Sequence, residues 1–366
     1  MDNLFFELLH VVVGNSTCLS HTPSVKEWKE LYALAYDHAL LGVCFSSLNI
    51  LDKQEQLSEM PLQLKMHWLA MVVQIQKRNE LMNQRCVELQ KRLVQDDFRT
   101  YIMKGQGNAI LYGDKLCSLR QSGDIDIYLE GGYKKVIDYV NRTFPTKDVN
   151  ELEIHYHCFN DVEVEIHYKP FVKDSPKDKN LQSFFKECEE ANFANKLSVP
   201  KTDEHIIVPT SEFNLVHQLV HIHHHLFYEG IGLRQLMDYY FLLQKTSDGS
   251  TDSIKRSKKV IHLLGLDRFA AALMYVLQVV FGIERNKMLW SPSKKDGIFL
   301  LNEIMRSGNF GQLDVHNKGI YLNKWKSFWY IHFKTFRYWR FDYWAWFWSP
   351  IYRIRGFAWR KMNGYN

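Results

Sequence analysis

The stretch "RQSGDIDIYL", residues 120–129, places two aspartates, Asp124 and Asp126, in a run of apolar residues. Strands usually exclude aspartate. Alternation along a strand turns both carboxylates to one face and sends Ile125 and Ile127 to the other face. Two neighbouring carboxylates repel each other unless one is protonated or a cation lies between them. The stretch therefore predicts a strand whose polar face binds a cation.

The residues around this strand predict a small α/β unit. Upstream, "FRTYIMKG" (98–105) is typical of a strand, and "GQGNAILYG" (105–113) is typical of a loop that enters a helix. Downstream, Tyr133–Arg142 has the periodicity of a helix. "ELEIHYHCFNDVEVEIHYKP" (151–170) then alternates strictly between polar and apolar residues, which indicates two strands joined as a hairpin.

The register of this hairpin follows from its two faces. A two-residue turn pairs Tyr156 with Glu165 and mixes polar with apolar side chains. A three-residue loop at 159–161 pairs His155 with Glu165 and keeps the two sets apart, so we expect that register. One face of the sheet then gathers six polar residues: Glu153, His155, His157, Glu163, Glu165 and His167.

Helical patterns flank the unit on both sides. Leu62–Gln95 is a long segment without glycine or proline. Beyond the hairpin helices resume, with Ser211 as an expected N-cap. The predicted fold class is α+β with a small mixed β-sheet core. The predicted domains are an N-terminal helical region (1–97), the core (98–172) and a C-terminal helical region (173–366).

The paired aspartates suit a divalent cation. Magnesium is a hard ion that proteins hold with one or two carboxylates together with substrate phosphates. A third carboxylate on a neighbouring strand would complete a two-metal site, which activates an attacking oxygen and stabilises a leaving one. Glu165 is the expected third ligand and Glu163 the second choice. We therefore predict Asp124, Asp126 and Glu165 as Mg²⁺ ligands and catalytic residues.

The segment "KGQGNA", residues 104–109, suits a phosphate group. Its glycines allow a phosphate to approach the backbone, and a helix N-terminus adds N–H donors and a partial positive charge. The cations of Lys104 and Arg120 are expected to neutralise phosphate charge. The predicted binding residues are Lys104, Gly105, Gly107, Asn108, Arg120, Ser122 and Gly123.

Together these motifs resemble a known family. A glycine-rich turn, a helix, a strand with two aspartates and a strand with one glutamate resemble, in that order, the nucleotidyltransferase fold of the DNA polymerase β superfamily. More narrowly, "LYGDKLCSLRQSGDIDIYL" (111–129), "VEIHY" (164–168) and "GIGLRQLMDYYFLL" (230–243) resemble a bacterial group of uncharacterised nucleotidyltransferases.

The resemblance implies Mg²⁺-dependent transfer of a nucleoside monophosphate from an NTP to an acceptor hydroxyl, with release of pyrophosphate. It matches Asp124 and Asp126 to the metal-binding pair, Glu165 to the third carboxylate and Gly105 to the phosphate-turn glycine. The sequence departs from the superfamily at that turn, where Gly105-Gln106-Gly107 replaces the usual Gly-Gly or Gly-Ser.

Other functions stay open at this point. The altered glycine turn motivates a non-catalytic nucleotide- or RNA-binding module on the same fold. The basic C-terminus motivates a toxin-like transferase that acts on tRNA. The acceptor of a transferase could be a sugar, another small molecule, a protein side chain or RNA.

Two polar clusters follow the core. "HIHHH" (221–225) lacks the carboxylate of an HExxH motif, which favours core or cleft-lining histidines over a zinc site. Arg234 and Asp238 are four residues apart on an expected helix, so a plain ion pair is the first interpretation. The resemblance implies that these two residues brace the helical domain against the cleft.

The charge is concentrated at one end of the chain. The net charge is +5, but the last fifty residues hold ten Lys/Arg and one acid, so that tail carries +9 and the rest −4. Aromatic residues follow helical spacing from Trp325 to Trp348, and Ser349-Pro350 suits the start of a new helix. Three interpretations remain: a core helix, a nucleic-acid platform and an interfacial helix on anionic lipid.

The composition indicates a globular protein with a cytoplasmic location. Hydrophobic residues make up 46% of the chain and charged residues 24%. The six cysteines are scattered without a CxxC pair, as expected for reduced thiols. No stretch resembles a signal peptide, and we expect no transmembrane segment because the apolar runs are too short.

Overall fold

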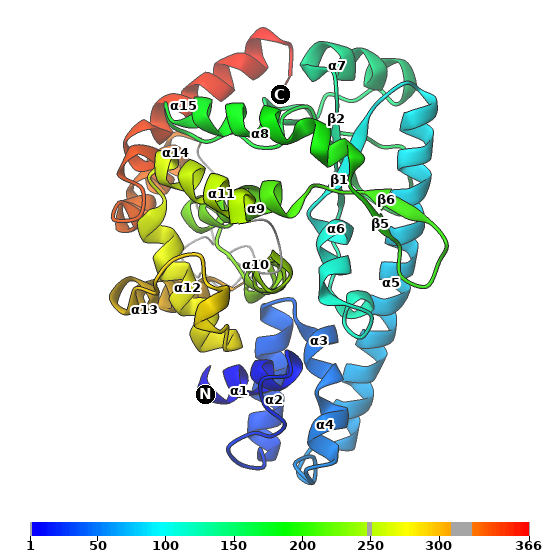
Figure 1. Ribbon diagram of the computed structural model, residues 1–366, viewed down its shortest axis with the longest axis vertical. Coiled ribbons are helices and arrows are strands. Elements are labelled where there is room, and N and C mark those ends of the chain that lie inside the picture. The colour runs from blue at the N-terminus through cyan, green and yellow to red at the C-terminus, as the bar shows by residue number, and fades with distance from the viewer. Residues whose placement is uncertain (1, 247–250, 309–323, 366) are drawn as a thin grey trace.

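The computed structural model describes residues 2–246, 251–308 and 324–365 and has an α+β fold, as predicted (Figure 1). A four-stranded mixed sheet lies between two groups of helices. Its strands, in spatial order, are β1 Thr100–Met103, β2 Ile125–Leu129, β4 Val164–His167 and β3 Glu153–His155. β2 and β4 run parallel, and the two outer pairs are antiparallel.

The register of the sheet confirms the sequence prediction. His155 lies opposite Glu165, and Glu165 is in turn the neighbour of Asp126 across the parallel pair. The strands are shorter than the alternation suggested, because β3 ends at His155 and β4 begins at Val164. The connection between them therefore spans 156–163 rather than the predicted three residues.

The N-terminal helices form one end of the molecule (Figure 1). The 34-residue helix α5, Leu62–Gln95, has the predicted limits and runs alongside the sheet. Its buried Cys86 and Leu89 share a hydrophobic cluster with Ile125 and Ile127 of β2. The apolar side chains of β2 thus lie in a core cluster to which α5 contributes, and the face with the aspartates is left for a cavity. The other N-terminal helices are α1 Asp2–Val12, α2 Val25–Asp37, α3 Leu41–Ser46 and α4 Leu48–Asp52.

Helices also dominate the rest of the chain. Thr210, not the predicted Ser211, caps α9, because its side chain accepts a hydrogen bond from the N–H of Phe213. A small hairpin, β5 Lys196–Ser198 with β6 His205–Ile207, was not predicted. The helices of this part are α6 Gly105–Ala109, α7 Gly132–Thr143, α8 Asp178–Ala194, α9 Ser211–Tyr228, α10 Leu233–Thr246, α11 Thr251–Leu264, α12 Asp267–Phe281 and α13 Lys294–Ser307.

The chain ends in two aromatic helices, α14 Lys324–Thr335 and α15 Tyr343–Met362. Pro350 lies inside α15, so the predicted helix start at Ser349-Pro350 is wrong. The true N-cap is Asp342, whose carboxylate accepts a hydrogen bond from the N–H of Ala345. Within the described ranges, none of the helices has the length and apolar character needed to cross a membrane.

Candidate active site

A cavity of about 320 Å³ lies between the polar face of the sheet and helices α9 and α10. The sheet contributes the carboxylates of Asp126 and Glu165, and the loop before β2 contributes Asp124. The opposite wall comes from α9 and α10. Eight predicted site residues line this one cavity: Lys104, Gly105, Asn108, Arg120, Gly123, Asp124, Asp126 and Glu165.

Asp126 accepts two hydrogen bonds on one carboxylate oxygen. Its Oδ1 accepts a hydrogen bond from Lys104 Nζ at 2.7 Å and another from His167 Nε2 at 2.9 Å. His167 Nε2 also lies 3.3 Å from a carboxylate oxygen of Glu153 and 3.9 Å from one of Glu165. His167 therefore touches three acids at once, from a position two residues along β4 from Glu165.

The electrostatics separate the acids into two kinds. Burial alone would raise the pKa of Asp126, but Lys104 and the hydrogen bond from His167 hold that pKa well below its usual range. Burial and the charge of Asp126 instead raise the pKa of Glu165 to about 9. The charge of Asp126, followed by burial, also raises the pKa of Asp124. One acid is thus firmly ionised beside two that hold their protons more tightly.

Two groups of side chains in the described residues have ligand atoms close enough to hold a metal ion. One group is Asp126, Glu165 and His167, and the other is Glu153, His155 and Glu165. Glu165 belongs to both. Carboxylate oxygens suit Mg²⁺, and the imidazoles add ligands that transition metals such as Mn²⁺ or Zn²⁺ accept. The donor set therefore fits a divalent cation, and it includes His167, which the sequence analysis had not assigned.

Lys104 is positioned by a strained turn at the end of β1. Its backbone has φ +44° and ψ −143°, a conformation that side-chain-bearing residues rarely adopt. Gly105 follows with φ +34°, and a Cβ there would lie 3.4 Å from the carbonyl oxygen of Asp124. That distance is an ordinary contact, so it is the positive φ, which glycine adopts without strain, that suits Gly105 to this turn beside the aspartate loop. Burial opposes the charge of Lys104, but Asp126 more than compensates and raises its pKa.

Two predicted binding residues do not line the cavity. A Cβ on Gly107 would lie 3.1 Å from the carbonyl oxygen of Ile102, so this glycine serves close packing of α6 on β1. The Ser122 hydroxyl lies 2.7 Å from both Asn79 Oδ1 and Gln106 Oε1, away from the carboxylates. Glu163, the second choice for third ligand, is exposed and also lies outside.

Arg120 is held by a buried ion pair rather than being available to phosphate. Its Nε and Nη2 donate to the two carboxylate oxygens of Asp238 at 2.7 and 2.8 Å, and both side chains are only 5% exposed. Asp238 also accepts hydrogen bonds from Tyr112 and Asn108. The predicted Arg234–Asp238 pair is therefore not the main contact of Asp238. Arg234 instead donates to the carbonyl oxygen of Gln121 at 2.8 Å.

The α9 wall of the cavity carries histidines, as expected for cleft-lining residues. His221 and His225 lie one turn apart with their Nε2 atoms 3.1 Å from each other. Nδ1 of His225 donates to Glu229 at 2.7 Å. Burial holds the pKa of His221 well below its ordinary value and lowers that of His224 to about 4. His221 and His224 therefore make this wall polar without adding positive charge at neutral pH.

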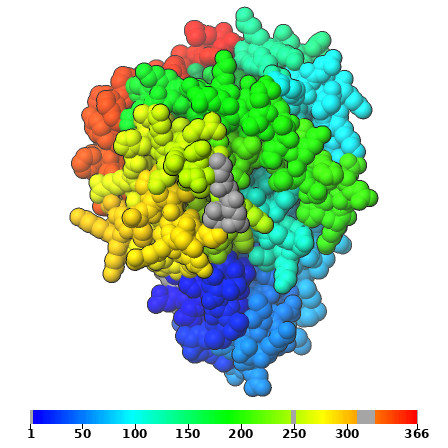
Figure 2. All heavy atoms as spheres, in the orientation of Figure 1, coloured from blue at the N-terminus to red at the C-terminus, as the bar shows by residue number. Residues whose placement is uncertain are grey.

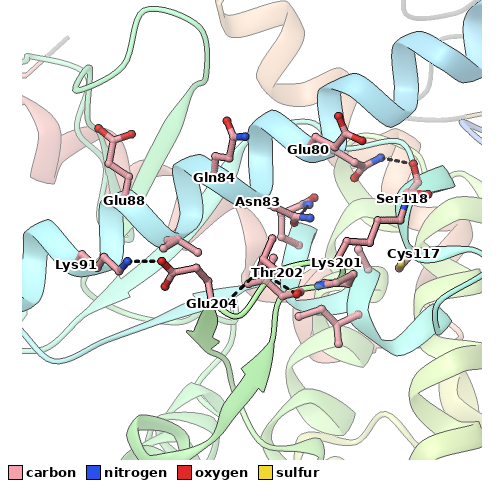
Figure 3. Close-up of a pocket in the computed structure, with 17 residues that line it drawn as sticks. Glu80, Asn83, Gln84, Glu88, Lys91, Cys117, Ser118, Lys201, Thr202 and Glu204 are labelled. Atoms are coloured by element: carbon pink, nitrogen blue, oxygen red, sulfur yellow. Dashed lines mark hydrogen bonds and ion pairs between the residues drawn. The ribbon is translucent and has the colours of Figure 1, made fainter.

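A second cavity, of about 520 Å³, adjoins a different face of α6 (Figure 3). Glu88 and Lys91 of α5 lie on one side of it, and Lys91 pairs with Glu204 at 2.6 Å. The three predicted metal ligands do not line it. Gln106 links this cavity to the loop that carries Asp124, because its side chain forms hydrogen bonds with Asn83 in the cavity and with Ser122 in the loop. The acids of the larger cavity, Glu80, Glu88 and Glu204, belong to neither of the two groups of described residues that could hold a metal ion.

A family model covers the greater part of the chain. The model of a family described as uncharacterised nucleotidyltransferase matches residues 24–282. The chain belongs to this family. The matched part contains the entire carboxylate cavity, and it ends before α13, α14 and α15.

Other comparisons with known proteins add little to the family assignment. No curated protein sequence matches this family member. One solved structure is similar, an antigenic nucleotidyltransferase-like protein from Paracoccidioides brasiliensis. It has 11% identity, and the similarity covers 49% of this chain and 87% of that chain at a TM-score of 0.29. A TM-score this low carries no argument about the present site.

Proposed function

We propose that this protein transfers a nucleoside monophosphate from an NTP to an acceptor hydroxyl. The acceptor oxygen forms a bond to the α-phosphorus, the bond from that phosphorus to the β-phosphate breaks, and pyrophosphate leaves while the hydroxyl proton is lost. The observation that carries the proposal is the pairing of Asp126 with Glu165 across β2 and β4 inside one cavity, in a chain of this family. We place the fold in the DNA polymerase β superfamily and the protein in a bacterial cytoplasm.

The carboxylates are assigned to Mg²⁺. Asp124, Asp126 and Glu165 would hold the ion, with His167 as a further ligand or as the donor that orients Asp126. Bound Mg²⁺ supplies charge neutralisation for the phosphates and lowers the pKa of the acceptor hydroxyl. Asp126 is suited to the part because its low pKa keeps it ionised at neutral pH.

The chain's own cations are assigned to the triphosphate. Lys104 is the ammonium group nearest to the acids, and Arg234 lines the same cavity from α10. Positioned cations of this kind stabilise negative charge that shifts toward the leaving pyrophosphate. The Arg120–Asp238 pair joins the aspartate loop to α10, so it is assigned to positioning the two walls rather than to substrate contact.

The proposal is tested by incubating the protein with α-³²P-labelled NTPs and a cell extract. Wild-type protein should label an acceptor and release unlabelled pyrophosphate, and γ-labelled NTP should label no acceptor. Asp126→Asn should abolish labelling. Glu163→Gln is the matched control, because it removes one carboxylate from the same polypeptide segment outside the cavity and should label normally.

The remaining outcomes decide between the alternatives. NTP binding without any labelled product would overturn the transferase assignment in favour of a non-catalytic nucleotide-binding module. Labelled tRNA as the product would identify a toxin-like tRNA nucleotidyltransferase, and a labelled sugar, small molecule or protein would identify the acceptor class directly.

A further inference from the structure

The two last helices present an aromatic face to solvent. Its residues come from α14, α15 and the turn between them, and each is between 43% and 80% exposed. In Figure 2 this part of the chain, coloured orange to red, lies at the rim of the molecule. The aromatic face consists of Trp329, Phe333, Phe336, Trp339, Tyr343, Trp344, Phe347, Ile351, Ile354, Phe357 and Met362. Such a concentration of exposed large apolar side chains marks an interaction surface.

The spacing of these residues forms a continuous stripe along α15. Tyr343, Phe347, Ile351 and Ile354 recur every three or four residues, which places them on one side of the helix. Met362 extends the same stripe to the end of the helix. At about 1.5 Å per residue, the twenty residues of α15 give this stripe a length of about 30 Å.

The opposite side of α15 is docked on the protein, so the stripe has a fixed direction. Asp342, the N-cap, forms a buried ion pair with Lys173. At the other end of the helix, the Tyr365 hydroxyl lies 2.8 Å from the Tyr133 hydroxyl of α7, and the Trp359 ring packs against the same tyrosine. A helix anchored at both ends cannot turn its apolar stripe inward. The first interpretation from the sequence, that these aromatics form a core helix, therefore fails for this face.

Positive charge surrounds the stripe. Between residues 326 and 361 the chain has eight Lys/Arg and a single acid, Asp342, which is buried. Arg337, Arg340 and Arg355 pair with Glu303, Asp296 and Glu151 outside this segment, and these pairs neutralise part of the excess. Lys361, near the end of α15, is exposed. The partner of this surface should therefore combine an apolar layer with negative charge.

We propose that the aromatic face binds the surface of an anionic lipid bilayer. Trp and Tyr rings favour the boundary between headgroups and hydrocarbon, and Lys/Arg beside them attract anionic headgroups. The aliphatic Ile351, Ile354 and Met362 continue the stripe, and these side chains gain from hydrocarbon but offer no ring on which a base could stack. The attachment is peripheral, because no described helix can cross a membrane.

A second copy of the chain is a poorer partner for this face. In a twofold dimer the same patch would lie against its copy, so two segments with an excess of positive charge would be brought together. The membrane proposal also stands apart from the transferase activity, because the aromatic face lies outside the part of the chain that the family model matches.

The proposal is tested by co-sedimentation of the full-length protein with lipid vesicles. Vesicles of phosphatidylcholine with phosphatidylglycerol should bind the protein, pure phosphatidylcholine should bind it weakly, and high salt should weaken binding. The emission of the exposed tryptophans should shift to the blue on binding. The triple variant Phe347→Gln/Ile351→Gln/Ile354→Gln should lose at least about ten-fold in vesicle affinity.

The matched control is Leu62→Gln/Met66→Gln/Val73→Gln, which removes three exposed apolar side chains from α5 and should bind vesicles like the wild type. Both variants replace exposed residues, and equal melting temperatures would show that folding is unchanged. Equal binding by the two variants would overturn the proposal. A protein that does not bind vesicles would also overturn the proposal. Salt-sensitive binding of single-stranded RNA would then identify a nucleic-acid surface, and self-association that the α15 variant abolishes in sedimentation velocity would identify a dimer interface.

Discussion

At the scale of single residues, Asp126 shows how a charge arrangement that looks unfavourable in the sequence is stabilised. Two aspartates on one strand face should repel each other, and the first expectation is that a metal must separate them. In the structure the ammonium group of Lys104 lies 2.7 Å from Asp126, and His167 lies 2.9 Å from the same oxygen. The chain therefore supplies part of the neutralising charge itself.

Asp126→Asn tests this arrangement. The pKa of Asp126 is lower in the folded protein than in the unfolded chain, so the ionised carboxylate stabilises the fold at any pH above the ordinary carboxyl pKa. This stabilisation is lost as the pH falls through the depressed pKa of the folded state. At neutral pH the variant should lose about 1–3 kcal/mol of unfolding free energy, since it removes charged hydrogen bonds from buried partners. Its rate should fall by at least about 100-fold, as for loss of one fixed electrostatic group. Urea denaturation and NTP turnover measure both.

Repulsion between the aspartates alone would predict the opposite sign of the stability change. A metal-free Asp126→Asn protein that is more stable than the wild type would therefore show that Lys104 does not pair with Asp126 in solution. Glu163→Gln, which removes an exposed carboxylate, should change neither stability nor turnover.

Glu165 predicts a pH dependence of metal binding. In the metal-free protein its pKa is about 9, because of burial and the charge of Asp126. A carboxyl group must lose its proton to bind a metal, so Mg²⁺ affinity should rise with pH. At pH values below the pKa of Glu165, the association constant should increase by up to about ten-fold for each pH unit. Calorimetry in buffers with different ionisation enthalpies should detect the release of about one proton per bound ion. Mg²⁺ affinity that does not change with pH would exclude Glu165 as a ligand.

The same shift affects stability without metal. Because the pKa of Glu165 is higher in the folded protein than in the unfolded chain, the protonated carboxyl group stabilises the folded state at low pH. This contribution to the unfolding free energy is lost as the pH rises from the pKa of the unfolded chain toward about 9. In the presence of a chelator, the wild type should therefore lose stability between neutral pH and about 9, and Glu165→Gln should lose less. Parallel thermal melts of both proteins across this range are the measurement.

At the scale of elements, a buried ion pair holds the aspartate loop against α10. Arg120 and Asp238 are 118 residues apart, yet they form two hydrogen bonds in the interior. Arg120→Ala should cost about 3–5 kcal/mol of unfolding free energy, because it leaves the Asp238 charge buried without its main partner. Arg120→Lys should not restore this stability, since an ammonium group cannot replace the two parallel bonds.

The control for this prediction is Arg99→Ala. Arg99 also bonds two carboxylates, Glu130 and Glu190, but it does so at the surface, where solvent screens the charges. Denaturation should show a much smaller loss for Arg99→Ala than for Arg120→Ala. Equal losses in the two variants would mean that the Arg120 pair is not buried in solution.

The features that the sequence predicted are those with local signals. Alternation was sufficient for β2 and for the pairing of His155 with Glu165, and the lack of glycine and proline gave the limits of α5. The grouping of Asp126 with Glu165 was predicted from the need for a third carboxylate on a neighbouring strand and from the family resemblance, and the parallel pairing of β2 with β4 places the two side by side. The strands of the β5–β6 hairpin have only three residues each, which is too short for a pattern of alternation to be recognised.

The features that were missed depend on distant contacts. Arg120 was assigned to phosphate because no signal within one sequence marks its pairing with Asp238. His167 was placed on the polar face correctly, but alternation cannot distinguish a histidine that touches three acids from one that faces solvent. Pro350 was taken as a helix start because the cap at Asp342, which is held by Lys173, is recognisable only in three dimensions.

At the scale of the whole molecule, the basic C-terminal segment packs on the rest of the chain, which has a negative net charge. A buried ion pair joins the two parts. Lys173, in the segment before α8, pairs with Asp342 at the start of α15, and both side chains are almost fully buried. The pair orients the helix that carries the aromatic face. The carboxylate cavity and the aromatic face are thus separate parts of the protein. Removing the Lys173–Asp342 ion pair should destabilise α15 more than the sheet that carries the carboxylates.

Lys173→Met tests this separation. The substitution keeps most of the side-chain volume but leaves Asp342 buried without its ammonium partner, a change that typically costs about 3 kcal/mol or more. Because Asp342 caps α15, hydrogen exchange should accelerate first at the amides from Ala345 onward, while the amides of β2 stay protected. Lys169→Met, which replaces an exposed lysine of the same segment, should leave both regions unchanged. Faster exchange in β2 to the same extent as in α15 would show that the helix and the sheet unfold as one unit.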